Sequence, residues 1–167
     1  MGWSISAAII VAVAAGSVQQ SDDPILRPAC TGISVSVLAE APQVKAGDKP
    51  WFSVAVSNNT DRSVRVLDVR DGRRPDLQDS YFELFVIQGR RTVNVPIAIS
   101  DPGPLSAADF LELQPGARVQ FQHISHKRAL QELLPGAYEA FILFWRDPLV
   151  SGTTRCRSTS ARFTVHD

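Results

Sequence analysis

Apolar and polar residues alternate in a series of short segments that begins at residue 33. In the first segment Ile33, Val35 and Val37 alternate with Ser34 and Ser36. A period of two places successive side chains on opposite faces of a strand, so one face packs and the other contacts solvent. Similar apolar segments follow at 52–57, 64–66, 81–87, 93–99, 117–124, 137–145 and 161–165. We therefore expect about eight strands.

Turn-forming residues separate these segments. Glycine supplies a positive φ and proline fixes φ near about −65°, so Pro115-Gly116 and Pro135-Gly136 indicate turns between strands. Repeated strands joined by turns, with no long helical period, are typical of a sandwich. The predicted fold is all-β: an immunoglobulin-like antiparallel β-sandwich of about eight strands with one short crossover helix.

The crossover helix is expected at 126–134, where apolar residues recur at helical spacing after Ser125 and Pro135-Gly136 provides the stop. The following residues, 134–138, are similar to the tyrosine corner of immunoglobulin-like folds. We expect the Tyr138 side chain to point into the sandwich and its hydroxyl to hydrogen-bond back to the crossover backbone.

Four segments carry a family resemblance. They are 50–61 (PWFSVAVSNNTD), 80–90 (SYFELFVIQGR), 109–125 (DFLELQPGARVQFQHIS) and 134–141 (LPGAYEAF). In sequence and order they resemble the immunoglobulin-like domain that precedes the catalytic domain of deuterolysin-type and peptidyl-lysine metalloendopeptidases. The H-E-x-x-H zinc motif of those proteases is absent from this sequence. The resemblance therefore implies an accessory module without the protease domain.

The amino-terminal residues predict export. Residues 5–15 are apolar or small, too short a run to span about 30 Å of hydrocarbon comfortably, and small residues follow as a cleavage zone. We expect a signal peptide at 1–20, a flexible lead-in at 21–30 and the sandwich at 31–167. Gly2 with Ser6 also satisfies the loose myristoylation pattern, but the apolar run behind it favours export. The mature protein is thus predicted to be periplasmic or secreted, with no membrane span.

The chain has two cysteines, Cys30 before the first strand and Cys156 near the last. In an exported chain an even count predicts a disulfide, which here would join the two ends of the domain. The alternative is a pair of buried free thiols.

Charge excludes some partners. Seventeen basic and seventeen acidic side chains cancel. A neutral domain lacks the basic patch expected of nucleic-acid binders and has no electrostatic attraction to anionic lipid. We expect neither nucleic acid nor membrane as a partner.

Two groups of side chains suggest metal binding, and each has a simpler interpretation. His123 and His126 form an H-x-x-H, but residues three apart on a strand face opposite sides, and no third ligand is identified. Four aspartates at 68, 71, 76 and 79 suggest calcium, but arginines at 70, 73 and 74 neutralise them. We interpret both groups as solvated or locally paired side chains and expect no metal or cofactor.

No catalytic motif is recognised. The sequence has no G-x-S-x-G, the cysteines are expected to be oxidised, and no Ser, His and Asp are spaced like a triad. Asn58-Asn59-Thr60 is formally a glycosylation sequon, but we interpret it as a turn. We expect a protein that is not an enzyme.

The strand 137–145 suggests a partner site. If Tyr138 faces the core, alternation places Phe141, Leu143 and Trp145 on the opposite face, which is apolar where a half-wet sheet would be polar. Either another segment of the chain covers these three side chains, or they form an exposed strip that binds a partner, with Trp145 as its anchor.

The sequence thus predicts an exported, non-catalytic immunoglobulin-like module that binds another extracytoplasmic protein or ligand. An accessory regulator or inhibitor of a secreted protease is the alternative that the family resemblance suggests, with 100–108 as the candidate inhibitory loop. A weak metal-binding protein is the third hypothesis.

Overall fold

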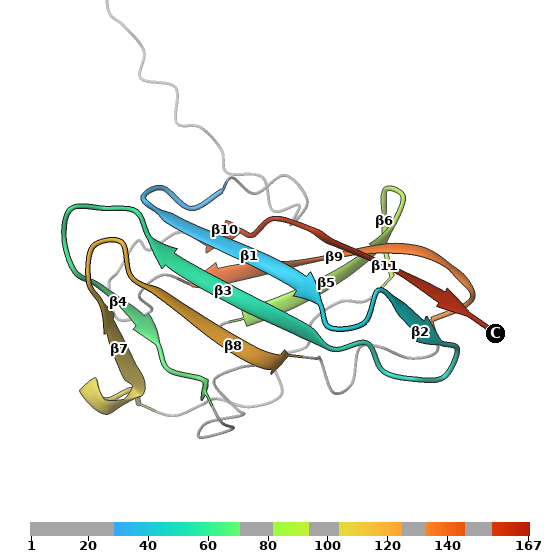
Figure 1. Cartoon of the computed structure of the whole chain (residues 1–167), viewed down its shortest axis with the longest axis horizontal. Helices are drawn as coiled ribbons and strands as arrows, with labels where there is room; N and C mark the ends of the chain where they lie inside the picture. Colours follow the sequence, from blue (N-terminus) through green and yellow to red (C-terminus); the bar gives the residue numbers. More distant parts are fainter. Residues whose placement is uncertain (1–28, 71–81, 94–103, 125–132, 146–154) are drawn as a thin grey trace, which may run out of the picture.

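The computed structural model describes residues 29–70, 82–93, 104–124, 133–145 and 155–167. Within these ranges the chain forms eleven strands and a short 3-10 helix at Ala107–Asp109 (Figure 1). The strands are β1 (Ile33–Ala39), β2 (Gln43–Lys45), β3 (Phe52–Asn58), β4 (Val64–Leu67), β5 (Phe82–Gln88), β6 (Arg91–Thr92), β7 (Phe110–Leu113), β8 (Arg118–Ile124), β9 (Gly136–Trp145), β10 (Arg155–Arg157) and β11 (Ala161–His166).

Hydrogen bonding groups these strands into three sheets. One has the order β1-β3-β8, the second has the order β2-β11-β9-β5-β6 with β10 also paired to β9, and β4 pairs with β7. The chain leaves the first sheet after β1 and continues in the second, where β2 runs parallel to β11. The other named strand pairs are antiparallel. β2 and the last strand, β11, are therefore held in the same sheet.

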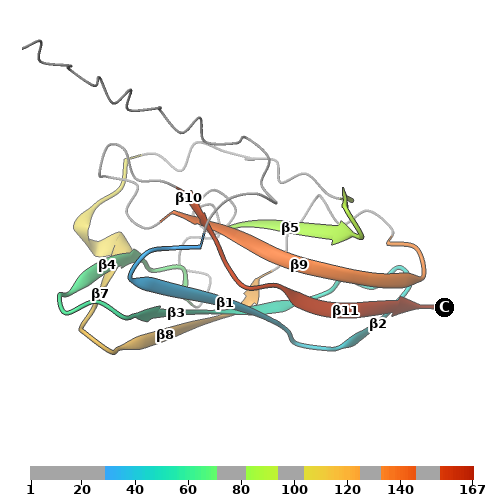
Figure 2. The same cartoon turned by 90° about the horizontal axis from the view of Figure 1, so that it is seen from above.

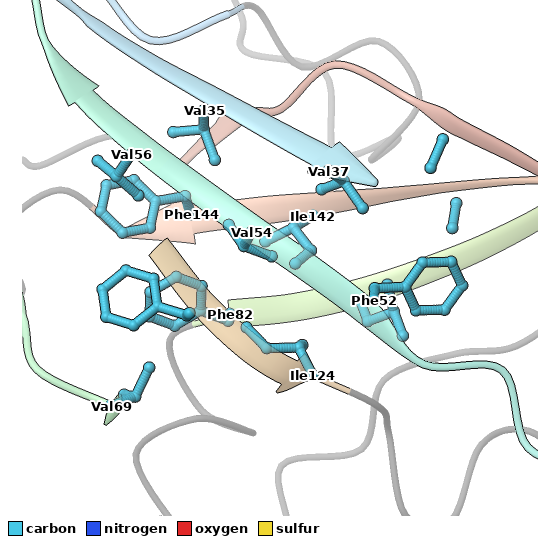
Figure 3. Packing of buried hydrophobic residues seen from close by; sticks show 14 of the residues in the cluster. Val35, Val37, Phe52, Val54, Val56, Val69, Phe82, Ile124, Ile142 and Phe144 are labelled. Carbon is cyan, nitrogen blue, oxygen red and sulfur yellow. The ribbon is translucent and has the colours of Figure 1, made fainter. Parts of the chain in front are cut away.

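The two larger sheets pack face to face around the main core. Figure 2 shows them as two layers, with β3 and β8 in one and β5 and β9 in the other. Rings from opposite layers meet edge to face, with 5.1 Å between the centroids of Phe82 and Phe121 and 5.6 Å between those of Phe52 and Phe163. Figure 3 shows part of this core close by, with Phe52 and Phe82 among the labelled side chains. Burial of apolar side chains is the main favourable contribution to folding.

Alternation along the strands decides which side chains enter this core. In β1, Ile33, Val35 and Val37 are buried, as the period of two predicts. The predicted all-β sandwich is confirmed, with more strands than the eight or so expected. The additional strands β2, β6, β7 and β10 contain two to four residues each, too few to show a period. The predicted signal peptide lies outside the described residues, as do most of the strand at 93–99 and of the crossover helix.

Two turns between consecutive strands contain glycine in the left-handed region. Gly89, between β5 and β6, has φ of 61°, and Gly116, between β7 and β8, has φ of 72°. Residues with a Cβ adopt this conformation at a cost, so the glycines allow these reversals without strain.

The tyrosine corner is confirmed. The Tyr138 side chain is buried near the start of β9, and its hydroxyl donates a hydrogen bond of 2.7 Å to the carbonyl oxygen of Leu134. The Tyr138 ring also stacks against Phe163 of β11 at a centroid distance of 5.5 Å. The bond fixes the direction in which the chain enters β9.

No helix long and apolar enough to span a membrane occurs in the described ranges.

Candidate functional site

The predicted partner strip lies on β9, and the structure places its residues as alternation requires. Tyr138, Ile142 and Phe144 face the main core. Phe141 and Leu143 face the other side of the same sheet, where they form a second apolar cluster with Phe85 and Ile87 of β5. The two strands are neighbours, and Phe85 lies directly opposite Phe141.

This second cluster is buried, which contradicts the hypothesis of an open docking strip at Phe141 and Leu143. Their exposed fractions are 0% and 3%. The Phe141 ring stacks on Phe85 with 5.2 Å between centroids. The guanidinium of Arg157, a residue of β10, lies 4.1 Å from the centroid of the Phe141 ring. Because exposure was the condition for a partner strip, Phe141 and Leu143 are corrected to core residues.

Trp145, the proposed anchor of that strip, is half-buried at the end of β9. Arg155, its antiparallel partner on β10, places its guanidinium 4.4 Å from the centroid of the indole. Arg155 also forms an ion pair of 3.0 Å with Glu83 of β5. Trp145 is therefore part of a contact that links β10, β9 and β5, and does not form an open surface with Phe141.

The predicted disulfide is present. Cys30 and Cys156 are bonded, with 4.8 Å between their Cα atoms and a sequence separation of 126. Cys156 is in β10, opposite Phe144 of β9, so the bond attaches the segment before β1 to the second sheet. The interpretation as free thiols is excluded for this structure.

The Asn58 side chain of the formal sequon is buried at the end of β3. Its amide nitrogen donates to the carbonyl oxygens of Arg62 (2.7 Å) and Leu113 (2.9 Å). Its amide oxygen accepts from the backbone nitrogen (3.0 Å) and the hydroxyl (2.7 Å) of Thr60. With 0% exposure and four hydrogen bonds, this amide organises a turn, in agreement with that interpretation of the sequence.

The metal hypotheses gain no support from the residues that the structure describes. No group of three or more His, Cys, Asp or Glu side chains is close enough there to hold an ion. The Asp68 carboxylate accepts two hydrogen bonds from the Arg70 guanidinium, at 2.9 and 3.0 Å. This is the local pairing expected from the sequence. His126 and the other three aspartates lie outside the described residues.

An exposed apolar surface occurs elsewhere, on the outer face of the sheet formed by β1, β3 and β8. Leu38 is 60% exposed and Trp51 is 42% exposed. Leu38 lies opposite Ser53, and the backbone nitrogen of Glu40 donates to the Trp51 carbonyl oxygen at 2.9 Å. The four side chains therefore form a square on one face, with Leu38 and Trp51 as diagonal neighbours. We refer to Leu38, Glu40, Trp51 and Ser53 as the Trp51 surface.

A hollow of about 360 Å³ adjoins this surface, between the turns that flank β2. Trp51 forms one wall, and the polar lining residues are Glu40, Gln43, Lys45, Asp48 and Lys49. Its size is within the range of small-ligand sites, about 300–1,000 Å³. The Lys49 ammonium lies 5.0 Å from the centroid of the Trp51 ring. We call this space the Trp51 hollow.

A second hollow, of about 510 Å³, lies along β9 and β11. Its aromatic residues, Tyr138 and Phe163, are 5% and 2% exposed, and an ion pair of 3.0 Å between Arg162 and Glu139 lies in its lining. It therefore offers no open aromatic face, in contrast to the Trp51 hollow.

Trp51 is not among the site residues expected from the sequence, although strand alternation gives a signal for it. Phe52, Val54 and Val56 are the inward residues of β3, so the same alternation places Trp51 on the solvent face together with Ser53. A tryptophan on an otherwise small and polar face is the unusual feature. The hollow beside Trp51 could not be predicted in this way, because it is formed by the turns around β2, whose residues show no alternation.

Comparisons with known proteins leave the function to be argued from these residues. The sequence matches no protein-family model and no curated protein sequence. Among solved structures it is similar to the crystal structure of Spo0M, a sporulation control protein from Bacillus subtilis, with 12% identity and a TM-score of 0.42. The alignment covers 83% of this chain and 51% of that one, so the chain spans about half the length of Spo0M. The relation to metalloendopeptidase accessory domains stays a prediction.

Proposed function

We propose that this chain is an exported, non-catalytic immunoglobulin-like module that binds an extracytoplasmic ligand at the Trp51 surface and the Trp51 hollow. The observation that carries the proposal is the 42% exposure of Trp51 at the wall of a hollow lined by hydrogen-bonding side chains. Large aromatic residues contribute most of the binding energy in many interfaces.

The hollow is held in place by backbone hydrogen bonds. Asp48 donates to Lys45 at 2.9 Å within the turn after β2, and Ala46 donates to His166 of the last strand at 2.7 Å. Thr164 of β11 donates to Pro42 at 3.0 Å on the other side of β2. A site whose walls are already ordered loses less entropy when it binds a ligand.

The disulfide supports the predicted compartment. Bonds such as Cys30–Cys156 persist in the periplasm and outside the cell and are rare in the reducing cytosol. A module stabilised in this way would meet ligands outside the cytosol, in agreement with the predicted signal peptide.

The proposed binding function is tested by capturing the ligand from the protein's own extracytoplasmic extract. The secreted, disulfide-bonded chain is immobilised, and the retained material is compared between wild type, Trp51→Ala and Leu134→Ala. Leu134 is the control because it is a large apolar side chain, 73% exposed, that does not belong to the Trp51 surface. We expect Trp51→Ala to lose a ligand that wild type and Leu134→Ala retain. Equal capture by all three proteins, or no capture by any, would contradict the proposal.

A further inference from the structure

The chemistry of the Trp51 hollow points to one class of ligand. We infer that it binds a neutral carbohydrate, with the apolar face of a pyranose ring on Trp51 and the ring hydroxyls bonded to the surrounding polar side chains. This inference rests on the proposed binding function and adds the ligand class to it.

The charge of the lining favours an uncharged ligand. Glu40 and Asp48 carry two negative charges, and Lys45 and Lys49 carry two positive charges, so the formal charges of the lining sum to zero. A site for a phosphate, a carboxylate or a cation is expected to carry an excess of the opposite sign. A hydroxyl both donates and accepts hydrogen bonds, so a neutral polyol can use carboxylates and ammonium groups at the same time.

The distribution of apolar area favours a small amphipathic ligand over a protein partner. Stable protein interfaces bury about 1,200–2,000 Å² in total around a well-packed centre. Leu38 and Trp51 are the large exposed apolar side chains of this face within the described residues, and the side chains beside them are Glu40 and Ser53. One indole face surrounded by hydrogen-bonding groups suits a pyranose, whose axial C–H bonds form an apolar face bordered by hydroxyls.

Polar groups lie next to the indole in the Trp51 hollow. The Ser53 hydroxyl donates to a Glu40 carboxylate oxygen at 3.2 Å, which orients Glu40 beside the indole. The Lys49 ammonium lies over the Trp51 ring, 5.0 Å from its centroid, and carries three donors on a long side chain. A sugar stacked on Trp51 would take the place of this ammonium over the ring, and its hydroxyls would then meet donors from the displaced Lys49 side chain and an acceptor from Glu40.

Direct titration tests the ligand class. The secreted, disulfide-bonded chain is titrated calorimetrically with cello-, malto- and chito-oligosaccharides up to millimolar concentration. We expect at least one series to bind, Trp51→Ala to lower its association constant by about tenfold or more, and Trp51→Phe to keep most of the affinity because an aromatic face remains. Leu134→Ala should bind as wild type does, and unchanged melting temperatures show that the variants are folded. Binding that Trp51→Ala leaves unchanged would overturn the site.

A chemical treatment of the natural extract separates this inference from the proposed function. Periodate cleaves the vicinal diols of sugars, whereas a protease destroys protein partners. Capture that depends on Trp51, is lost after periodate and survives protease supports the carbohydrate. Capture that depends on Trp51 but survives periodate and is lost after protease overturns the carbohydrate and leaves the binding function intact. If no oligosaccharide binds and nothing is captured, both proposals fail.

Discussion

Replacing Asn58 by alanine should destabilise the domain severely, although Asn58 lies in a polar turn sequence. The buried amide makes four side-chain hydrogen bonds: two donated, to the carbonyl oxygens of Arg62 and Leu113, and two accepted from Thr60. A buried hydrogen bond contributes about 1 kcal/mol, and a buried group left without a partner costs about 1–3 kcal/mol. The bond to Leu113, 55 residues away, is buried, so water cannot readily replace it.

The expected loss for Asn58→Ala is about 3–4 kcal/mol of unfolding free energy, a large part of the 5–15 kcal/mol typical of a domain. Asn59→Ala is the matched control, because the neighbouring amide makes an exposed bond of 3.0 Å to Ser34. That change should cost less than about 0.5 kcal/mol. Urea unfolding of the disulfide-bonded proteins, followed by tryptophan fluorescence, measures both values. A loss below about 1 kcal/mol for Asn58→Ala, or equal losses for the two variants, would refute the assignment of Asn58 as a buried organising residue.

Three further changes test the packing. Tyr138→Phe removes the bond to the Leu134 carbonyl and should cost about 1–2 kcal/mol in urea melts, whereas an unchanged midpoint would contradict the tyrosine corner. Phe141→Ala should cost about 3–5 kcal/mol because the ring is fully buried, and a surface-like loss below about 1 kcal/mol would restore the partner strip. Replacing Cys30 and Cys156 together by serine should cost about 2–5 kcal/mol, and non-reducing peptide mapping of the wild type should recover the linked pair.

Trp51 and Phe141 differ in how far the rest of the chain covers them. Both are aromatic residues on the outer face of a sheet, and alternation alone treats them alike. Phe141 has apolar neighbours, because Phe85 and Leu143 belong to the same buried cluster. The guanidinium of Arg157 also lies over its ring. Trp51 stands among polar side chains and keeps 42% of its surface exposed. Neighbours from other strands therefore determine which outer face is available for binding.

Much of the fold was predictable because strand alternation is a local property of the sequence. The inward positions of β1, β3 and β9 follow from a period of two, and the Tyr138 corner follows from five consecutive residues. Glycine and proline turns are equally local, since each depends on the φ of a single residue. The disulfide was predictable from a count of two cysteines in a chain expected to be exported.

The features of the fold that could not be predicted depend on contacts between residues distant in sequence. The short strands β2 and β10 exist because β11 and β9 offer them hydrogen-bonding partners. The burial of Phe141 depends on its neighbours across the sheet, and that of Asn58 on the Leu113 carbonyl of β7. The sequence by itself determined which side of each long strand a residue occupies. Only the tertiary structure decided whether that side is open, because exposure depends on what the rest of the chain packs against it.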